Sequence, residues 1–118
     1  MTRRPFQRLT IVRLMQHPER PPWDAGSDAI QAAHVAYLQG LHARGVILVN
    51  GPIEQLDDPM FRGMSLYTVS PDEARAFAAE DPAVRAGWFV PTVDGWIFPA
   101  VPRAIGDRVD LEVDVPEP

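Results

Sequence analysis

The chain has 118 residues, of which 46% are hydrophobic and 23% are charged, and it contains no cysteine. This length predicts one domain that buries about two-thirds of its unfolded surface, and the lack of cysteine excludes a disulfide framework, a thiol nucleophile and an iron–sulfur cluster. Sixteen acidic and eleven basic residues give a formal net charge of −5, which repels phosphate backbones and anionic lipid, so we expect neither a nucleic-acid nor a membrane partner.

The N-terminal residues superficially match an export signal. Arg3-Arg4 resembles a twin-arginine motif, but such a signal needs an uncharged apolar stretch of about 7–15 residues after it. Arg13 interrupts the apolar run 9–12, and the longest later run, 46–49, is too short to cross a bilayer. We therefore expect a cytoplasmic protein.

The first part of the chain is expected to form a strand, a long connection and a helix. Residues 9–14 alternate and are rich in β-branched side chains, which predicts a strand. Residues 17–26 contain three prolines and are expected to form an irregular connection. Ser27 is expected to cap a helix that runs to about Arg44 and stops at Gly45.

The second part is expected to supply a hairpin, another helix and a last strand. Ser70 as N-cap, Pro71 as first helical residue and Glu73 two positions later form the pattern of a capping box. The expected elements are a buried strand at 46–49, a strand at 63–69, a helix at 71–80 that stops at 81–82, a short helical turn that resumes there and runs through 86–87, and a strand at 92–99.

This order, β-α-β-β-α-β, predicts a ferredoxin-like α+β fold. With right-handed crossovers, it forms a four-stranded antiparallel sheet with two helices on one face. The alternative is another two-layer α+β sandwich in which residues 109–115 add an edge strand. We expect residues 1–99 to form the domain and residues 100–118 to form a C-terminal extension.

His34 falls inside the apolar stripe of the first predicted helix. At about 100° per residue, it lies among Ile30, Ala33, Tyr37 and Leu41 on the side that should face the sheet. One interpretation is a structural histidine that hydrogen-bonds to a backbone carbonyl; the other depends on a partner from the second helix.

Asp81 falls on the sheet-facing side of the second predicted helix, one turn beyond Phe77. A buried, unpaired carboxylate is costly, although Asp81-Pro82 can also be a simple helix stop with its side chain in solvent. Because both helices cover one face of the sheet, Asp81 can accept a hydrogen bond from His34 and fix its tautomer. The other ring nitrogen then faces a cavity, which is a general acid/base arrangement that needs no metal.

The sequence gives little support to other chemistries. His17 and His42 make only a weak case for a metal, so we expect no metal and no cofactor. The sequence contains no Walker motif, dinucleotide glycine motif, nucleophile-elbow motif or zinc-protease helix motif.

A series of short motifs resembles the YciI-like (YCII-related) family. They are His34 to Leu38, Gly45, residues 46–49, Gly51-Pro52, Ser65, the helix start at 70–74, Asp81-Pro82, Gly87 and the strand around Trp96. The resemblance spans about residues 7–99 and implies a homodimeric α+β-barrel, in which two sheets pack face to face, with an active site on His34 and Asp81. The connection 17–26 is longer than this resemblance leads us to expect, and residues 100–118 have no counterpart.

Four further side chains are candidates for contact with a substrate. Ser65 and Tyr67 can line a pocket together if they share a strand face, or Ser65 can face solvent. Trp23 can cover the pocket or anchor its own loop. Trp96 shares a strand face with Phe98 and can stack on a substrate or belong to the core or the dimer seam.

The residues and the resemblance together support three hypotheses. The first is a dimeric enzyme of lyase, isomerase or dehalogenase type that moves a proton on a compact, phenolic or lactone-like metabolite. The resemblance supplies this chemistry, since one relative removes halide from a chlorinated hydroxyquinol and similar folds isomerise muconolactones. The second is a non-catalytic module that binds a small ligand or partner and keeps the pair as a structural contact. The third is a relative of haem-binding monooxygenases.

Overall fold

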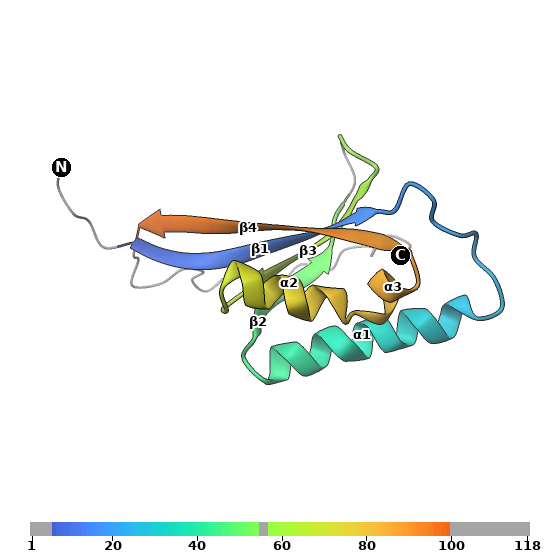
Figure 1. The fold of residues 1–118 in the computed structure, drawn as a ribbon, viewed down its shortest axis with the longest axis horizontal. Coiled ribbons are helices and arrows are strands. Elements are labelled where there is room, and N and C mark those ends of the chain that lie inside the picture. Colours follow the sequence, from blue (N-terminus) through green and yellow to red (C-terminus); the bar gives the residue numbers. More distant parts are fainter. Residues whose placement is uncertain (1–5, 55–56, 100–118) are drawn as a thin grey trace.

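Residues 6–54 and 57–99 are the part of the chain that the computed structural model describes, and they form four strands and three helices (Figure 1). The elements are β1 (Phe6–Gln16), α1 (Ser27–Ala43), β2 (Ile47–Pro52), β3 (Phe61–Tyr67), α2 (Pro71–Ala79), α3 (Pro82–Arg85) and β4 (Phe89–Pro99). The expected extension 100–118, with its candidate strand at 109–115, lies outside the described residues.

The strands form one antiparallel sheet in the order β2-β3-β1-β4, and the helices cover one of its faces (Figure 1). This arrangement confirms the ferredoxin-like prediction. β1 is longer than expected because it is a central strand: it pairs with β3 from Thr10 to Met15 and with β4 from Phe6 to Gln16.

The core lies between this face of the sheet and the helices. Alternate residues of β1 and β3 point toward the helices, as Val12, Leu14 and Tyr67 do. The buried apolar side chains are Val12, Leu14, Leu41, Ile47, Tyr67, Ala74, Ala78, Ala83, Trp88 and Phe89. Among the described helices, none is long and apolar enough to pass through a membrane.

The opposite side of the sheet, which we call the open face, is also apolar. Val49, Leu66 and Ile11 lie side by side across β2, β3 and β1. The apolar side chains of this face are Leu9, Ile11, Met15, Val49, Met64, Leu66, Val90, Trp96 and Phe98, and each is half-buried or exposed. No described helix covers them (Figure 1).

Two glycines set the positions at which helices return to the sheet. Gly45 follows α1 with φ of 76° and Gly87 follows α3 with φ of 78°. In the second case the Gly87 N–H donates to Val84 O and the Trp88 N–H donates to Ala83 O, which is a Schellman motif. The expected stop of the first helix at Gly45 is therefore confirmed.

The structure corrects three local expectations. The strand at 46–49 is not buried: Ile47 is, but Leu48 and Val49 are 51% and 45% exposed, because β2 is an edge strand and helices cover only one face. Ser27 is the first residue of α1 rather than its N-cap, since its hydroxyl accepts the Asp24 N–H and Gly26 takes the cap position. Ala33 is exposed rather than part of the buried stripe.

Candidate functional site

His34 and Asp81 form a close pair between α1 and the start of α3. The Nδ1 atom of His34 lies 2.8 Å from Oδ1 and 2.9 Å from Oδ2 of Asp81. The aspartate side chain is 2% exposed and the histidine side chain 12%. The expected contact between the two helical segments is confirmed, and the alternative in which Asp81 points to solvent is wrong.

The sequence around Asp81 holds its carboxylate in place. Pro82 ends the run of α2, and Asp81 becomes the N-cap of α3, where its Oδ1 accepts the Ala83 N–H at 2.8 Å. The capping box that starts α2 is also present, with Ser70 Oγ accepting the Glu73 N–H. Asp81 thus combines a helix cap with a hydrogen bond to His34, and both fix its orientation.

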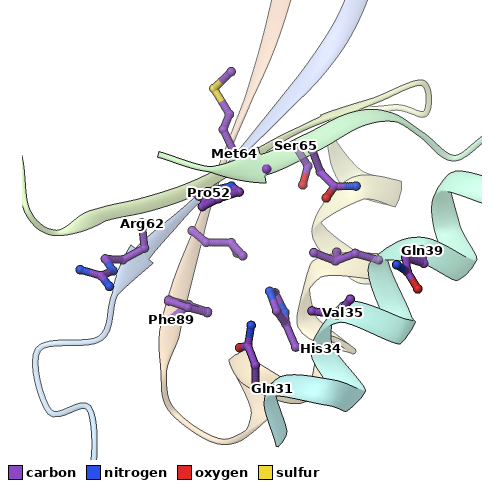
Figure 2. Close-up of a pocket in the computed structure, with 14 residues that line it drawn as sticks. Gln31, His34, Val35, Gln39, Pro52, Arg62, Met64, Ser65 and Phe89 are labelled. Atoms are coloured by element: carbon purple, nitrogen blue, oxygen red, sulfur yellow. The ribbon is translucent and has the colours of Figure 1, made fainter. Parts of the chain in front are cut away.

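This pairing decides which nitrogen of His34 is available for chemistry. A carboxylate only accepts hydrogen bonds, so in the neutral ring Nδ1 carries the hydrogen and donates it to Asp81. The lone pair is then on Nε2, and Figure 2 shows the imidazole projecting from α1 into a cavity. The ring of Phe89 packs beside it, with centroids 5.8 Å apart.

The cavity lies between α1 and the helix-facing side of β1, β2 and β3, and its volume is about 330 Å³. Such a volume is at the small end of ligand sites. The lining residues are Leu14, Gln31, His34, Val35, Leu38, Gln39, Asn50, Gly51, Pro52, Arg62, Gly63, Met64, Ser65 and Phe89. Apolar walls with a few polar groups suit a compact, ring-like ligand.

The sheet contributes polar groups on the wall opposite His34. Ser65 is buried and faces the helices, and Asn50 is its partner on β2. The Met64 side chain points away from the cavity (Figure 2), as alternation along β3 requires. The interpretation in which Ser65 faces solvent is therefore wrong.

Arginines lie around the Phe89 end of the cavity. Arg62 lines the cavity (Figure 2), and Arg20 from the proline-rich connection stacks over Trp88 and Phe89 at 4.8 and 5.2 Å from the ring centroids. Burial, and then the nearby charge of Arg62, lower the pKa of Arg20 below its ordinary value. Two guanidinium groups therefore lie near this end of the site.

Two of the residues expected to contact a substrate lie outside the cavity. Trp23 is 52% exposed and packs on Trp88, with centroids 5.3 Å apart, so it anchors the proline-rich connection to the start of β4. Trp96 is on the open face against Phe98, at 5.2 Å. Neither is among the residues that line the cavity.

Tyr67 shares the helix-facing side of β3 with Ser65, as expected, but it belongs to the core. It is 1% exposed and does not line the cavity. Burial first, and then the nearby Tyr37 and Asp81, raise the pKa of the Tyr67 hydroxyl above its ordinary value. Tyr37 donates to Phe77 O at 2.7 Å, so it links α1 to α2.

Several lining residues were not expected from the sequence. Gln31 precedes His34 by three residues, and the helical spacing that selected His34 also places Gln31 beside it. Phe89 precedes the strand expected at 92–99, and the observed start of β4 at this residue brings it into the site. Arg62 and Asn50 gave no signal in the sequence, since their place depends on the register of β2 and β3.

Within residues 6–54 and 57–99, no three histidine, cysteine, aspartate or glutamate side chains gather to hold a metal ion. His17 accepts the Glu19 N–H on its own Nδ1. His42 lies toward the far end of α1.

Fold and site together define a ferredoxin-like α+β protein with a buried histidine–aspartate pair at a small cavity. Residues 12–93 match the YCII-related domain, and the chain belongs to this family. Comparison with curated proteins finds no significant match. Among solved structures, 5-chloro-2-hydroxyhydroquinone dehydrochlorinase from Burkholderia phenoliruptrix, in complex with 2,5-dihydroxybenzoquinone, is similar, with 26% identity and a TM-score of 0.54 over 75% of this chain and 92% of that chain.

Proposed function

We propose that the protein is an enzyme that uses His34 and Asp81 for proton transfer on a compact phenolic or lactone-like metabolite. The observation that carries this proposal is the double contact of Nδ1 with the Asp81 carboxylate, while Nε2 is left to face the cavity. An oriented imidazole at the wall of a small cavity is the usual arrangement for a general acid/base.

The chemistry begins with Nε2 of His34, which accepts a proton from a hydroxyl or an acidic C–H of the ligand. The electron pair left on the ligand moves into a new π bond, and in an elimination the leaving group departs with its bonding pair. In an isomerisation, the protonated ring returns the proton to a different atom of the ligand. Asp81 stabilises the imidazolium through the existing contact and does not itself take the proton.

The similar dehydrochlorinase supports this class of reaction. Its ligand, 2,5-dihydroxybenzoquinone, is a six-membered ring with polar groups at its edge. The cavity of the present chain offers matching features: apolar walls formed by Leu38 and Phe89 and a polar wall that contains Ser65. We assign Ser65 to substrate binding, and Trp23 and Tyr67 to support of the site from outside the cavity.

A second candidate is a ligand-binding module without catalysis. The N-cap contact between Asp81 and Ala83 favours this possibility, because it gives the carboxylate a structural role that needs no reaction. In that case the pair with His34 stabilises the junction between α1 and α3 and nothing more.

The first test is turnover by purified protein and its His34 variants. We expect chloride release from 5-chloro-2-hydroxyhydroquinone, or proton exchange into phenols and lactones measured by NMR in deuterated water. His34→Gln keeps a donor for Asp81 but cannot carry the proton, so we expect a loss of at least about 100-fold in kcat. His42→Ala, at an exposed position further along α1, is the matched control and should retain activity.

The two candidates give opposite results in this test. If the pair is only structural, His34→Gln and His34→Ala lower the melting temperature, while ligand binding is unchanged and no turnover is found with the unmodified protein. An active His34→Gln variant would contradict catalysis by this ring directly.

We propose further that the active form is a homodimer joined through the open face. The apolar side chains on that face, with Trp96 45% and Val90 41% exposed, lie around the charged Arg13 and Asp94 and form an exposed surface of the kind that marks a protein interface. The same arrangement assigns Trp96 to the dimer seam rather than to the substrate site.

A further inference from the structure

Gln31 lies about one turn before His34 on the cavity-lining side of α1. The two residues are three positions apart, so they lie on the same side of the helix. Both line the cavity, and Figure 2 shows the Gln31 amide and the His34 imidazole extending from α1 in the same direction. A ligand that reaches Nε2 of His34 therefore also comes close to this amide.

The amide has an unmet hydrogen-bonding requirement. Among the side-chain atoms of the described residues, Gln31 Oε1 is buried and has no hydrogen-bond partner. Buried polar atoms in folded proteins nearly always have a partner, so this oxygen is left unsatisfied in the ligand-free protein. The terminal amide of glutamine rotates easily, and because Gln31 lines the cavity, a rotation that turns Oε1 from its closed position toward the cavity lets a ligand satisfy it. The partner must be a donor, because a carbonyl oxygen only accepts.

We infer that Gln31 is a specificity-determining residue that accepts a hydrogen bond from a hydroxyl group of the bound ligand. This inference rests on the proposed function and narrows its substrate class to compact ring compounds that carry a hydroxyl next to the reacting position. A site with a buried acceptor discriminates strongly against analogues without the donor, because binding them leaves the acceptor unpaired.

Gln31 and His34 have different roles because their side chains differ in basicity. The Gln31 amide is neutral and does not take up a proton near neutral pH, so it can hold a hydroxyl without competing for its hydrogen. His34 Nε2 is the basic atom and moves the proton. Gln31 thus orients the ligand toward His34, and it acts on binding and selectivity.

The test compares two probes with the same ring and the same para oxygens, hydroquinone and 1,4-dimethoxybenzene, of which only hydroquinone can donate hydrogen bonds. Dissociation constants are measured by quenching of tryptophan fluorescence or by calorimetry. We expect the unmodified protein to bind hydroquinone about tenfold more tightly or better, and Gln31→Met to lose most of this preference. Ala32→Met, at an exposed position on α1 that does not line the cavity, introduces the same side chain away from the site; it is the matched control and should keep the preference.

A second readout separates this role from a purely structural one. Because Oε1 has no partner in the empty site, Gln31→Met should leave the melting temperature of the ligand-free protein unchanged or higher. A structural glutamine would instead lose stability on substitution. Binding of hydroquinone is thus expected to weaken without any loss of stability.

Three results would overturn the inference: an unchanged preference in Gln31→Met, a clear loss of stability in the ligand-free variant, or no binding of hydroquinone by the unmodified protein. None of these measurements depends on turnover. A protein in which Gln31→Met loses the preference while His34→Gln causes no loss of activity would retain this inference and refute the proposed function.

Discussion

Asp81 serves two neighbours with one carboxylate, and this double role can be separated by substitution. Its Oδ1 accepts from the Ala83 N–H, and both oxygens contact Nδ1 of His34. In Asp81→Asn, one oxygen position becomes an amino group, which only donates and conflicts with the hydrogen on Nδ1. We expect kcat to fall by about 10- to 100-fold, with the helix cap kept.

Asp81→Ala provides the contrast, because it removes the cap as well as the partner of His34. We expect this variant to lose activity and also about 1 kcal/mol or more of stability, as for other lost N-caps. Turnover and urea unfolding of both variants measure the difference. Equal losses of stability in Asp81→Asn and Asp81→Ala would show that asparagine does not preserve a stabilising contact with the Ala83 N–H.

At the residue scale, helical spacing predicts the position of a site residue when a helix carries that residue. His34 is on α1, where its spacing places it on the side of the sheet. Asp81 is not inside the second helix, as its spacing suggested, but reaches His34 as the extended N-cap of α3, which depends on the stop at Pro82. Gln31 follows from the same spacing but carries no chemical signal of its own. Trp23 is on an irregular connection, and only the tertiary contact with Trp88 shows that it anchors this segment.

At the scale of elements, the helix ends at Gly45 and Ser70 are well encoded, whereas the start of α1 at Ser27 and the burial of the strands are not. Gly45 and Ser70 mark helix ends because backbone geometry requires particular residues there. The burial of a strand depends on what covers each face of the sheet. An apolar run such as 46–49 has the same sequence pattern in a central strand and in an edge strand. The exposure of Leu48 and Val49 therefore could not be predicted from their side chains.

Two glycines allow a test of backbone encoding that is independent of packing. An added Cβ would meet nothing within 4 Å at either Gly87 or Gly40. Gly87 has φ of 78°, so we expect Gly87→Ala to destabilise the protein by about 1 kcal/mol or more. Gly40 is inside α1, so Gly40→Ala should stabilise the protein by about 0.5–1 kcal/mol.

Urea unfolding of the two variants measures these opposite changes. Because Gly87 sets the turn that leads to Trp88 and Phe89, its substitution should also weaken ligand binding at the Phe89 end of the cavity. A stabilising effect of Gly87→Ala would contradict a left-handed conformation at this position in solution.

At the scale of the whole molecule, the order of elements and right-handed crossovers were enough to predict the sheet and its helical layer. The order of elements does not predict what covers the open face, since in the proposed dimer the covering surface comes from a second copy of the chain. The apolar side chains of Leu66 and Ile11 on the open face show only that covering this face is energetically favourable.

The proposed dimer predicts that a charge at the centre of the open face separates the subunits. Leu66 lies between Ile11 and Val49 in the sheet register and is half-buried in a single chain, so Leu66→Asp should place an unpaired carboxylate inside the interface. Light scattering after gel filtration should give twice the chain mass of 13.1 kDa for the unmodified protein and the monomer mass for this variant. Ala76→Asp, on the exposed side of α2, adds the same charge away from the interface and should remain dimeric. A monomeric unmodified protein, or a dimeric Leu66→Asp variant, would contradict assembly through this face.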